Sequence, residues 1–433
     1  MRRHATLIAA SLAVTLFAIF AVELLARTRP DAAVNTAEST FLWVAGATPA
    51  FPCGTDGRCG TDPDLAKLAN VKRSFAFAPS SGTFRIVCIG DSTTAGWPYQ
   101  PRGGYPEWLG EILRDVLPGG RVEVLNLGIH AWDGARLESV FTQALALRPE
   151  AVILRAGYND YPNFLLRYPR GGALGRLRRD AVIFLLTHSA AYRRLTRGMV
   201  ATNHRSFAVL APGEEARLLD EHRARLTRLA SSARSAGTVL IVLGLPSWSG
   251  FAPTYPGMRS LNDLAAANAG VARELGTHFV PLADLSRAGL FVDHVHSTSE
   301  GYRLTALAIA RAMSSAGVPA PARAWRWDRL RPMSAQRRAL GLEDPEYRMH
   351  LETALSIAYT GHGMREAAVE HMKAALLAAT NPDAIPDELN HDSIGETAGV
   401  YREVFARLRR EGRIVEPRGA ANRKFTGLEP NPR

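Results

Sequence analysis

The sequence predicts an α/β domain built around a parallel β-sheet, and three observations lead to this prediction. Hydrophobic residues make up 46% of the 433 residues and the mean hydropathy is −0.08, which is typical of a globular protein. Short apolar runs alternate with amphipathic segments from about residue 83 to residue 318, as in a parallel sheet with helices on both faces. The first apolar run also stops abruptly at Gly90-Asp91-Ser92.

The alternation gives an expected order of elements. Strands are expected at 84–89, 121–126, 151–156, 238–244 and 277–281, and helices at 105–117, 134–147, 214–236, 259–275 and 298–315. Ligands of such sheets bind at the carboxyl ends of the strands. The residues able to carry chemistry fall at those ends, or on the loop before the last helix.

The first strand delivers a serine to a strand-to-helix turn. Ile86–Gly90 is apolar and partly β-branched, and small residues follow Asp91-Ser92. Such a turn exposes the hydroxyl of Ser92 at the edge of the sheet and directs helix-start amides at a ligand. A Gly-Asp-Ser tripeptide is common in surface turns, so its meaning depends on finding a base and an oxyanion hole downstream.

A serine hydroxyl needs a base that takes its proton, and the best candidate lies near residue 296. Asp293 precedes His296 by three residues, a spacing that can place the carboxylate beside the imidazole. Ser297 and Glu300 have the spacing of a capping box, so a helix is expected to begin just after the base. His294 is the competing candidate for the base.

Two further segments offer donors for an oxyanion. Gly128 ends the second strand, and Asn159 follows the third strand within Gly157-Tyr158-Asn159-Asp160. The backbone N–H groups of Ser92 and Gly128 and the side-chain amide of Asn159 could together stabilise a negatively charged oxygen. Glycine and asparagine are also common turn residues, so a purely structural role stays open for each.

Together, these four segments resemble the four sequence blocks of the SGNH, or GDSL-type, serine hydrolase superfamily. The match covers about residues 84–318: Ser92 in Gly-Asp-Ser, Gly128 in the second block, Asn159 in Gly-x-Asn-Asp, and Asp293 and His296 in Asp-x-x-His. The resemblance implies a three-layer flavodoxin-like parallel sheet. It also implies an esterase with a Ser-His-Asp triad, an acyl-enzyme intermediate, and no metal or organic cofactor.

Within the superfamily, the sequence is most similar to bacterial membrane-anchored members with a tetratricopeptide-like C-terminal extension. The segments that carry this likeness are Trp97-Pro98-Tyr99, the run ending at Gly128, and Phe291-Val292-Asp293-His294-Val295-His296. His296 is followed by Ser297, where proline is common.

The N-terminus resembles an uncleaved membrane anchor. After Met1-Arg2-Arg3-His4, residues 5–22 are apolar, about 18 residues, which is near the lower limit for spanning a bilayer. This run is long for a signal peptide and no clean cleavage site follows it, although a cleaved signal stays open. We expect residues 1–27 to form a single-pass transmembrane anchor, with the catalytic domain outside the cytoplasm, on the periplasmic side.

Residues 28–83 are rich in small and turn-forming residues and are expected to form a stalk or linker. Cys53 and Cys59 could close a small disulfide ring in an oxidising compartment. Cys88 lies in the apolar strand and is expected to be a buried thiol.

A long insertion at 161–212 separates the third and fourth strands. It holds Arg167, Arg170, Arg176, Arg178, Arg179, Arg193, Arg194, Arg197 and Arg205. Between them lies the apolar run 181–186. The insertion is expected to form a helical lid over the active site, or an interfacial helix on anionic lipid, and the two are compatible.

Residues 319–433 form a helical extension and tail. Helices are expected at 345–361 and 364–379, and their small-large spacing resembles a single tetratricopeptide-type hairpin. This hairpin is expected to pack on the main domain or on a protein partner. The tail after Arg413 is expected to be disordered.

The composition also bears on partners. The net charge of +11 favours anionic partners, but none of the familiar nucleic-acid modules is present, so nucleic acid ranks last. The expected substrate is an ester, either a lipid or an acylated glycan. Two alternatives stay open: a deacetylase or O-acyltransferase acting on a cell-surface glycan, and a tethered interaction or assembly factor with minor catalysis.

Overall fold

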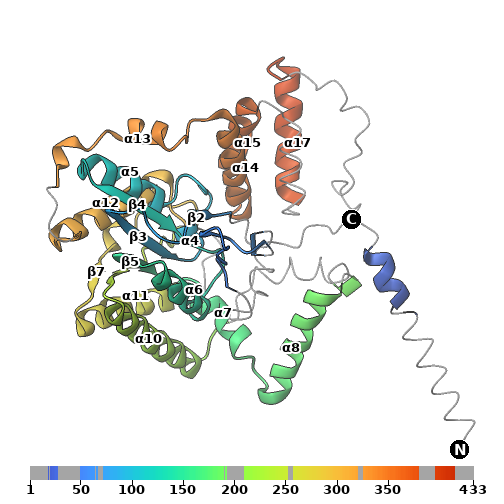
Figure 1. Cartoon of the computed structure of the whole chain (residues 1–433). Coiled ribbons are helices and arrows are strands. Elements are labelled where there is room, and N and C mark those ends of the chain that lie inside the picture. The colour runs from blue at the N-terminus through green and yellow to red at the C-terminus, as the bar shows by residue number, and fades with distance from the viewer. Residues whose placement is uncertain are drawn as a thin grey trace, which may run out of the picture.

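A five-stranded parallel sheet organises the residues that the structure describes (Figure 1). The computed structural model describes residues 18, 20–27, 49–63, 65–66, 72–189, 191–192, 209–251, 257–319, 325–379 and 395–414. The strands are β3 (Thr83–Gly90), β4 (Arg121–Asn126), β5 (Ala151–Arg155), β6 (Val239–Leu243) and β7 (His278–Val280). They pair in the order β4-β3-β5-β6-β7, and every pairing among them is parallel. The predicted parallel sheet is confirmed, with each strand within two residues of its expected bounds.

Helices cover both faces of the sheet and make a three-layer domain. The five that flank it are α5 (Tyr105–Val116), α6 (Gly134–Ala146), α10 (Pro212–Ser235), α11 (Met258–Leu275) and α12 (Ser299–Ser315). Alternate side chains of β3 point to opposite faces: Ile86 and Cys88 pack with α5 and α12, while Val87 and Ile89 pack with α6, α10 and α11. Because β3 is buried on both faces, its apolar run is continuous.

The start of α12 differs from the sequence-based expectation. The helix is capped by Thr298, whose hydroxyl accepts a hydrogen bond from the Gly301 N–H at 3.3 Å. Ser297 instead forms an isolated antiparallel bridge with Phe291. The predicted capping box of Ser297 and Glu300 is therefore wrong, because Ser297 is still part of the loop that carries the candidate base.

The predicted membrane anchor lies mostly outside the described residues. Residues 20–27 form a helix that includes only the end of the expected 1–27 segment. Among the helices described here, none combines the length and the apolar character needed to cross a bilayer. The single-pass anchor therefore stays a prediction.

The described part of the expected stalk, from residue 49 onward, is folded onto the domain. Strands β1 (Arg58–Gly60) and β2 (Ser74–Ala76) form an antiparallel pair, and Cys53 is disulfide-bonded to Cys59. Phe51 and Phe75 join the same apolar core as α6 and α10. Because its aromatic side chains are buried, this part is a structural component of the domain, whereas residues 28–48 of the expected stalk lie outside the described residues.

The insertion begins with two helices, α7 (Asp160–Arg167) and α8 (Gly172–His188). The run 193–208 lies outside the described residues. Figure 1 shows α8 extending away from the layered domain. Arg170, just before α8, forms an ion pair with Glu214 in the first turn of α10. The first part of the insertion therefore contacts the residues that directly follow it.

The C-terminal extension packs on the main domain. Its helices are α13 (Met333–Ala339), α14 (Pro345–Gly361), α15 (Arg365–Ala378) and α17 (Gly395–Arg410). Tyr347 of α14 donates a 2.6 Å hydrogen bond to the carbonyl of Tyr99, and Asp344 forms an ion pair with Arg102.

The α14–α15 hairpin matches the predicted helices, and α17 stands beside it in Figure 1. Docking of the hairpin on its own domain is confirmed, whereas the predicted disordered tail falls outside the described residues beyond 414.

Candidate active site

The turn after β3 places Ser92 at the start of a short helix. Asp91 caps this helix, α4 (Ser92–Ala95), by accepting hydrogen bonds from the backbone and the hydroxyl of Thr93, at 2.9 and 2.7 Å. Burial raises the pKa of Asp91, while its hydrogen bonds to Thr93 act in the opposite direction. The Asp91 cap therefore fixes the position of the Ser92 side chain relative to the sheet.

Gly90 makes this turn sterically feasible. A Cβ atom at this position would lie 2.1 Å from the hydroxyl of Thr94 and 2.6 Å from the carbonyl oxygen of Arg155. No other residue fits there without displacing β5 or α4. The glycine of the Gly-Asp-Ser segment is thus a packing requirement of the strand-to-helix turn.

The candidate base lies on a loop that holds its own carboxylate in place. One oxygen of Asp293 accepts hydrogen bonds from the backbone N–H groups of Val295 and His296, at 2.9 and 2.7 Å. The other oxygen contacts Nδ1 of His296 at 2.6 Å. The N–H of Val292 donates to the carbonyl of His296 at 2.9 Å and closes the loop. Asp293 is therefore positioned by backbone contacts before it orients the imidazole.

The structure brings together the three residues predicted as a triad. Nε2 of His296 lies 2.7 Å from the hydroxyl oxygen of Ser92, across 204 residues of sequence. The side chains of His296 and Asp293 are only 16% and 15% exposed. Burial alone would raise the pKa of Asp293, but the charge of His296 and the hydrogen bonds from His296 and Val295 lower it to about 2. Asp293 is therefore ionised at neutral pH.

The competing histidine points elsewhere. Nδ1 of His294 lies 3.2 Å from the carbonyl oxygen of Trp248, and its ring contacts Phe251 edge-on. The ring of His362, in the turn between α14 and α15, lies 5.4 Å from that of His294. The C-terminal hairpin therefore reaches the loop that carries the candidate base, a neighbour that local sequence patterns do not indicate.

Trp97 packs directly on the candidate base. Its ring centroid lies 4.7 Å from that of His296, and its carbonyl accepts a 2.6 Å hydrogen bond from the Tyr302 hydroxyl on α12. Sequence reasoning noted the Trp97 segment but gave it no role at the site. The contact restricts the rotation of the imidazole and ties α12 to the turn after α4.

Gly128 lies against the short helix that begins at Ser92. A Cβ atom here would lie 2.2 Å from the backbone nitrogen of Ala95 and 2.6 Å from the carbonyl carbon of Thr94. Its N–H donates a 3.0 Å hydrogen bond to the side-chain oxygen of Asn126. The glycine is thus next to the serine turn as expected, and its single N–H hydrogen is directed at Asn126.

Asn159 immediately precedes α7 and follows the end of β5 at Arg155. Its Nδ2 atom lies 3.3 Å from the carbonyl oxygen of Trp132 and donates to it. The amide nitrogen carries two hydrogens, and the bond to Trp132 uses one of them.

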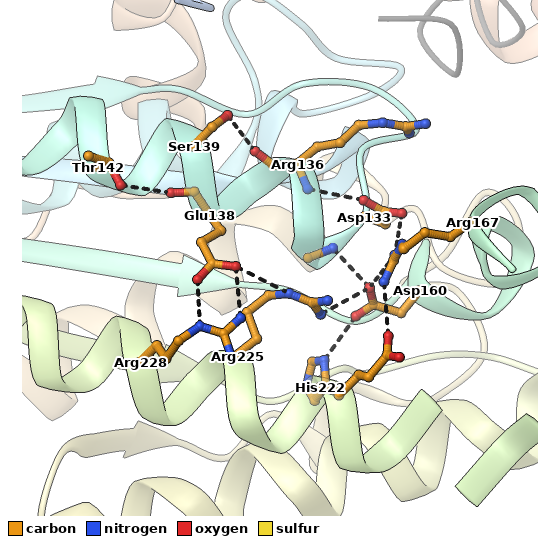
Figure 2. Close-up of polar contacts among 12 residues, drawn as sticks. Asp133, Arg136, Glu138, Ser139, Thr142, Asp160, Arg167, His222, Arg225 and Arg228 are labelled. Atoms are coloured by element: carbon orange, nitrogen blue, oxygen red, sulfur yellow. Dashed lines mark hydrogen bonds and ion pairs between the residues drawn. The ribbon is translucent and has the colours of Figure 1, made fainter. Parts of the chain in front are cut away.

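A buried polar cluster surrounds Asp160, the residue that follows Asn159 (Figure 2). Asp160 accepts hydrogen bonds from the Gly134 N–H and from Nδ1 of His222, both at 2.9 Å. Although burial raises the pKa of Asp160, the hydrogen bond from His222 and the charges of Arg225 and Arg167 hold it well below its usual value. Sequence reasoning missed His222 because it lies on a long amphipathic helix among many charged residues.

Across the described part of the chain, no group of three His, Cys, Asp or Glu side chains has the arrangement of a metal site.

Comparison with known proteins identifies the family. The family model described as GDSL-like lipase/acylhydrolase matches residues 88–304, which is half of the chain. No curated protein matches the sequence.

Several solved structures resemble the chain. An acetylxylan esterase from Geobacillus stearothermophilus is 19% identical, with a TM-score of 0.36 over 53% of this chain and 93% of that one. A lipolytic protein of the G-D-S-L family from Desulfitobacterium hafniense is 18% identical, with a TM-score of 0.35 over 53% and 99%. A GDSL-like lipase from Parabacteroides merdae is 15% identical, with a TM-score of 0.38 over 53% and 94%. At these scores the likenesses carry no argument about substrate, so the assignment rests on the family model: the chain belongs to the GDSL-like lipase/acylhydrolase family and is an ester hydrolase.

Proposed function

We propose that this protein is a serine esterase in which Ser92 is the nucleophile, His296 the general base and Asp293 the carboxylate that orients the base. The observation that carries the proposal is the pair of contacts made by His296, 2.7 Å to the Ser92 hydroxyl and 2.6 Å to the Asp293 carboxylate. Both lie within the range required for proton transfer between a nucleophile and its base.

The chemistry follows from this arrangement. Nε2 of His296 takes the hydroxyl proton of Ser92 while the serine oxygen attacks the ester carbonyl carbon. The resulting imidazolium gives its proton to the leaving alkoxide, which departs as an alcohol. Water then adds to the acyl-enzyme, with His296 again taking and returning a proton. Asp293 keeps Nδ1 protonated and stabilises the imidazolium at both steps.

The oxyanion of the tetrahedral intermediate is proposed to accept hydrogen bonds from the Ser92 N–H, the Gly128 N–H and the Asn159 amide. Gly128 must share its hydrogen between Asn126 and the oxyanion, or release Asn126 when substrate binds. Before substrate binds, the 3.0 Å hydrogen bond to Asn126 holds the Gly128 N–H in a fixed orientation.

The substrate is proposed to be a carboxylic ester of a lipid or of an acylated glycan. Hydrolysis and transfer use the same residues and differ only in whether water or a sugar hydroxyl resolves the acyl-enzyme. Deacetylation or O-acyl transfer on a cell-surface glycan is therefore the alternative reaction for this site. Docking of the α14–α15 hairpin on its own domain gives the alternative of a tethered assembly factor no specific support, because the face that packs there is not available to a partner.

We further propose that the protein is anchored in a membrane by residues 1–27, with its catalytic domain outside the cytoplasm. The apolar run 5–22 supports an anchor, and the disulfide between Cys53 and Cys59 fits an oxidising compartment. Glu23, near the end of the proposed anchor, accepts a 2.8 Å hydrogen bond from Ser189, directly after α8.

Helix α8 has features of a helix that lies at a bilayer surface. Leu174, Leu177, Phe184 and Leu185 are all exposed, and their spacing places them on one face. Arg176 and Arg178 are exposed on the same helix and would meet anionic headgroups. Because Glu23 connects the end of α8 to the proposed anchor, this apolar face would lie close to the membrane.

Replacing the triad residues tests the mechanism. Ser92→Ala and His296→Ala are each expected to lower kcat for p-nitrophenyl acetate by on the order of 10^6-fold, because no activated nucleophile remains. Asp293→Asn is expected to lower it by on the order of 10^4-fold. His294→Ala is the matched control and should keep most of the activity, since His294 contacts Trp248 rather than Ser92. Unfolding curves should show each variant folded, and full activity of Ser92→Ala would overturn the assignment.

Replacing Gly128 tests the packing of the second block. Gly128→Ala is expected to cost about 1–3 kcal/mol of unfolding free energy and to lower kcat by on the order of 10²-fold, because the methyl group displaces the α4 backbone. Gly270→Ala in α11 is the control, since a Cβ there would meet nothing within 4 Å. Equal behaviour of the two variants in denaturation and activity assays would contradict this account.

A fluorescent label on α8 tests its membrane contact. Leu177→Cys in the full chain, labelled with an environment-sensitive dye and reconstituted in anionic vesicles, should show a blue-shifted emission. Cys88 is buried and the other cysteines are paired, so the label goes to the new thiol. Leu377→Cys on α15, another exposed apolar position, should show no shift. The same emission at both positions would refute contact of α8 with the bilayer.

A further inference from the structure

Both ring nitrogens of His222 face hydrogen-bond acceptors in the interior of the protein. Nδ1 lies 2.9 Å from an oxygen of Asp160, and Nε2 lies 2.7 Å from the side-chain oxygen of Asn268. The side chains of His222 and Asp160 are 1% and 0% exposed. A neutral imidazole has one N–H donor and one acceptor nitrogen, so one of these two contacts would then bring two acceptors together.

The orientation of the Asn268 amide is fixed by its other partners. Its Nδ2 atom donates to the carbonyl oxygens of Ala156, at 3.2 Å, and Leu243, at 3.1 Å. Turning the amide around would point its oxygen at two carbonyl oxygens and its NH₂ group away from both. The side-chain oxygen therefore faces His222, and Nε2 must carry a hydrogen.

The charges around Asp160 keep it ionised, so Nδ1 must also carry a hydrogen. Arg225, one turn beyond His222 on α10, and Arg167 on α7 both have nitrogens 3.7 Å from an oxygen of Asp160. The Gly134 N–H at the start of α6 donates to the same oxygen. Arg167 is itself paired with Asp133 and with Glu221, the residue before His222. Together these groups favour an ionised Asp160 carboxylate, which accepts a hydrogen bond from Nδ1.

We propose that His222 donates a hydrogen bond from each ring nitrogen, to Asp160 and to Asn268, and that it thereby positions the segment 156–160, and with it the Asn159 amide, for catalysis. His222 does not contact Ser92 and is a positioning residue, not a catalytic one. Asn268 holds the carbonyl of Ala156 at one end of this segment, and Asp160 is held at the other. The inference rests on the proposed role of Asn159 in the oxyanion hole.

The close approach of Gly157 supports this role. Gly157 has a φ of +137°, and a Cβ there would lie 3.7 Å from Cε1 of His222 and 2.5 Å from Cδ1 of Leu245. A side chain at this position would meet Leu245 and reach the His222 ring, so the segment passes close to both. The ring holds Asp160 directly and Ala156 through Asn268, so it restricts Asn159 more than an apolar side chain of the same size could.

Nuclear magnetic resonance of the full chain tests the protonation state without reference to activity. With ¹⁵N-labelled histidine, and with His222→Gln used to assign its signals, both ring nitrogens of His222 should carry a directly bonded hydrogen in the active enzyme. One ring nitrogen without a hydrogen would overturn the proposed pair of donated bonds.

A double-mutant cycle tests the positioning role. His222→Gln, which keeps one donor, is expected to lower kcat for p-nitrophenyl acetate about tenfold with little change in KM, because one donor in the oxyanion hole is worth about 10²–10³-fold. In the Asn159→Ala background, His222→Gln should cause no further loss. Leu229→Ala, a buried substitution elsewhere on α10, should reduce stability and leave kcat of the folded enzyme unchanged.

The outcomes separate the claims. If His222→Gln lowers kcat by the same factor with and without Asn159, or does not lower it at all, the positioning role is refuted. If Asn159→Ala alone has no effect, Asn159 is not an oxyanion donor and the positioning role falls with it. Neither result touches the triad, whose failure would appear as undiminished activity of Ser92→Ala.

Discussion

The hydrogen bond between His296 and Ser92 is the contact on which the rest of this structure depends, because it joins two segments that are 204 residues apart in sequence. A parallel sheet makes the contact feasible: β3 ends at the same edge to which the chain returns after β7. The loop before α12 then needs only to reach across that edge. The Tyr302 hydroxyl on α12, bonded to the carbonyl of Trp97, holds the two sides at a fixed separation.

The site is supported from both faces of the sheet, by different means. On the α5 and α12 face, apolar packing and the Trp97 ring hold the base against the serine. On the α10 and α11 face, Asp160, His222 and Asn268 form a buried polar cluster next to the turn that carries Asn159. Figure 2 shows the contact between Asp160 and His222. Leaving one of these polar groups without its partner would cost more than each bond contributes, so the cluster specifies one arrangement of the turn.

Local patterns in the sequence were enough to predict the sheet, its flanking helices and the segments that meet at the site. They worked because buried parallel strands are continuous apolar runs, and because Gly90 and Gly128 have no room for a side chain. Contacts set by tertiary packing could not be read in the same way. Thr298 rather than Ser297 caps α12, because Ser297 pairs with Phe291 in the preceding loop. His362 contacts His294 because the C-terminal hairpin packs on the main domain, a contact between segments far apart in sequence.

The most direct measurement of the central claim is covalent labelling of the resting enzyme with a fluorophosphonate, followed by peptide mass spectrometry. A serine activated by a neighbouring imidazole attacks phosphorus, whereas an ordinary hydroxyl does not. The account predicts a single adduct on Ser92, formed in the native protein and lost when His296 is replaced by alanine. An adduct on a different residue, or labelling of Ser92 that does not depend on His296, would contradict it.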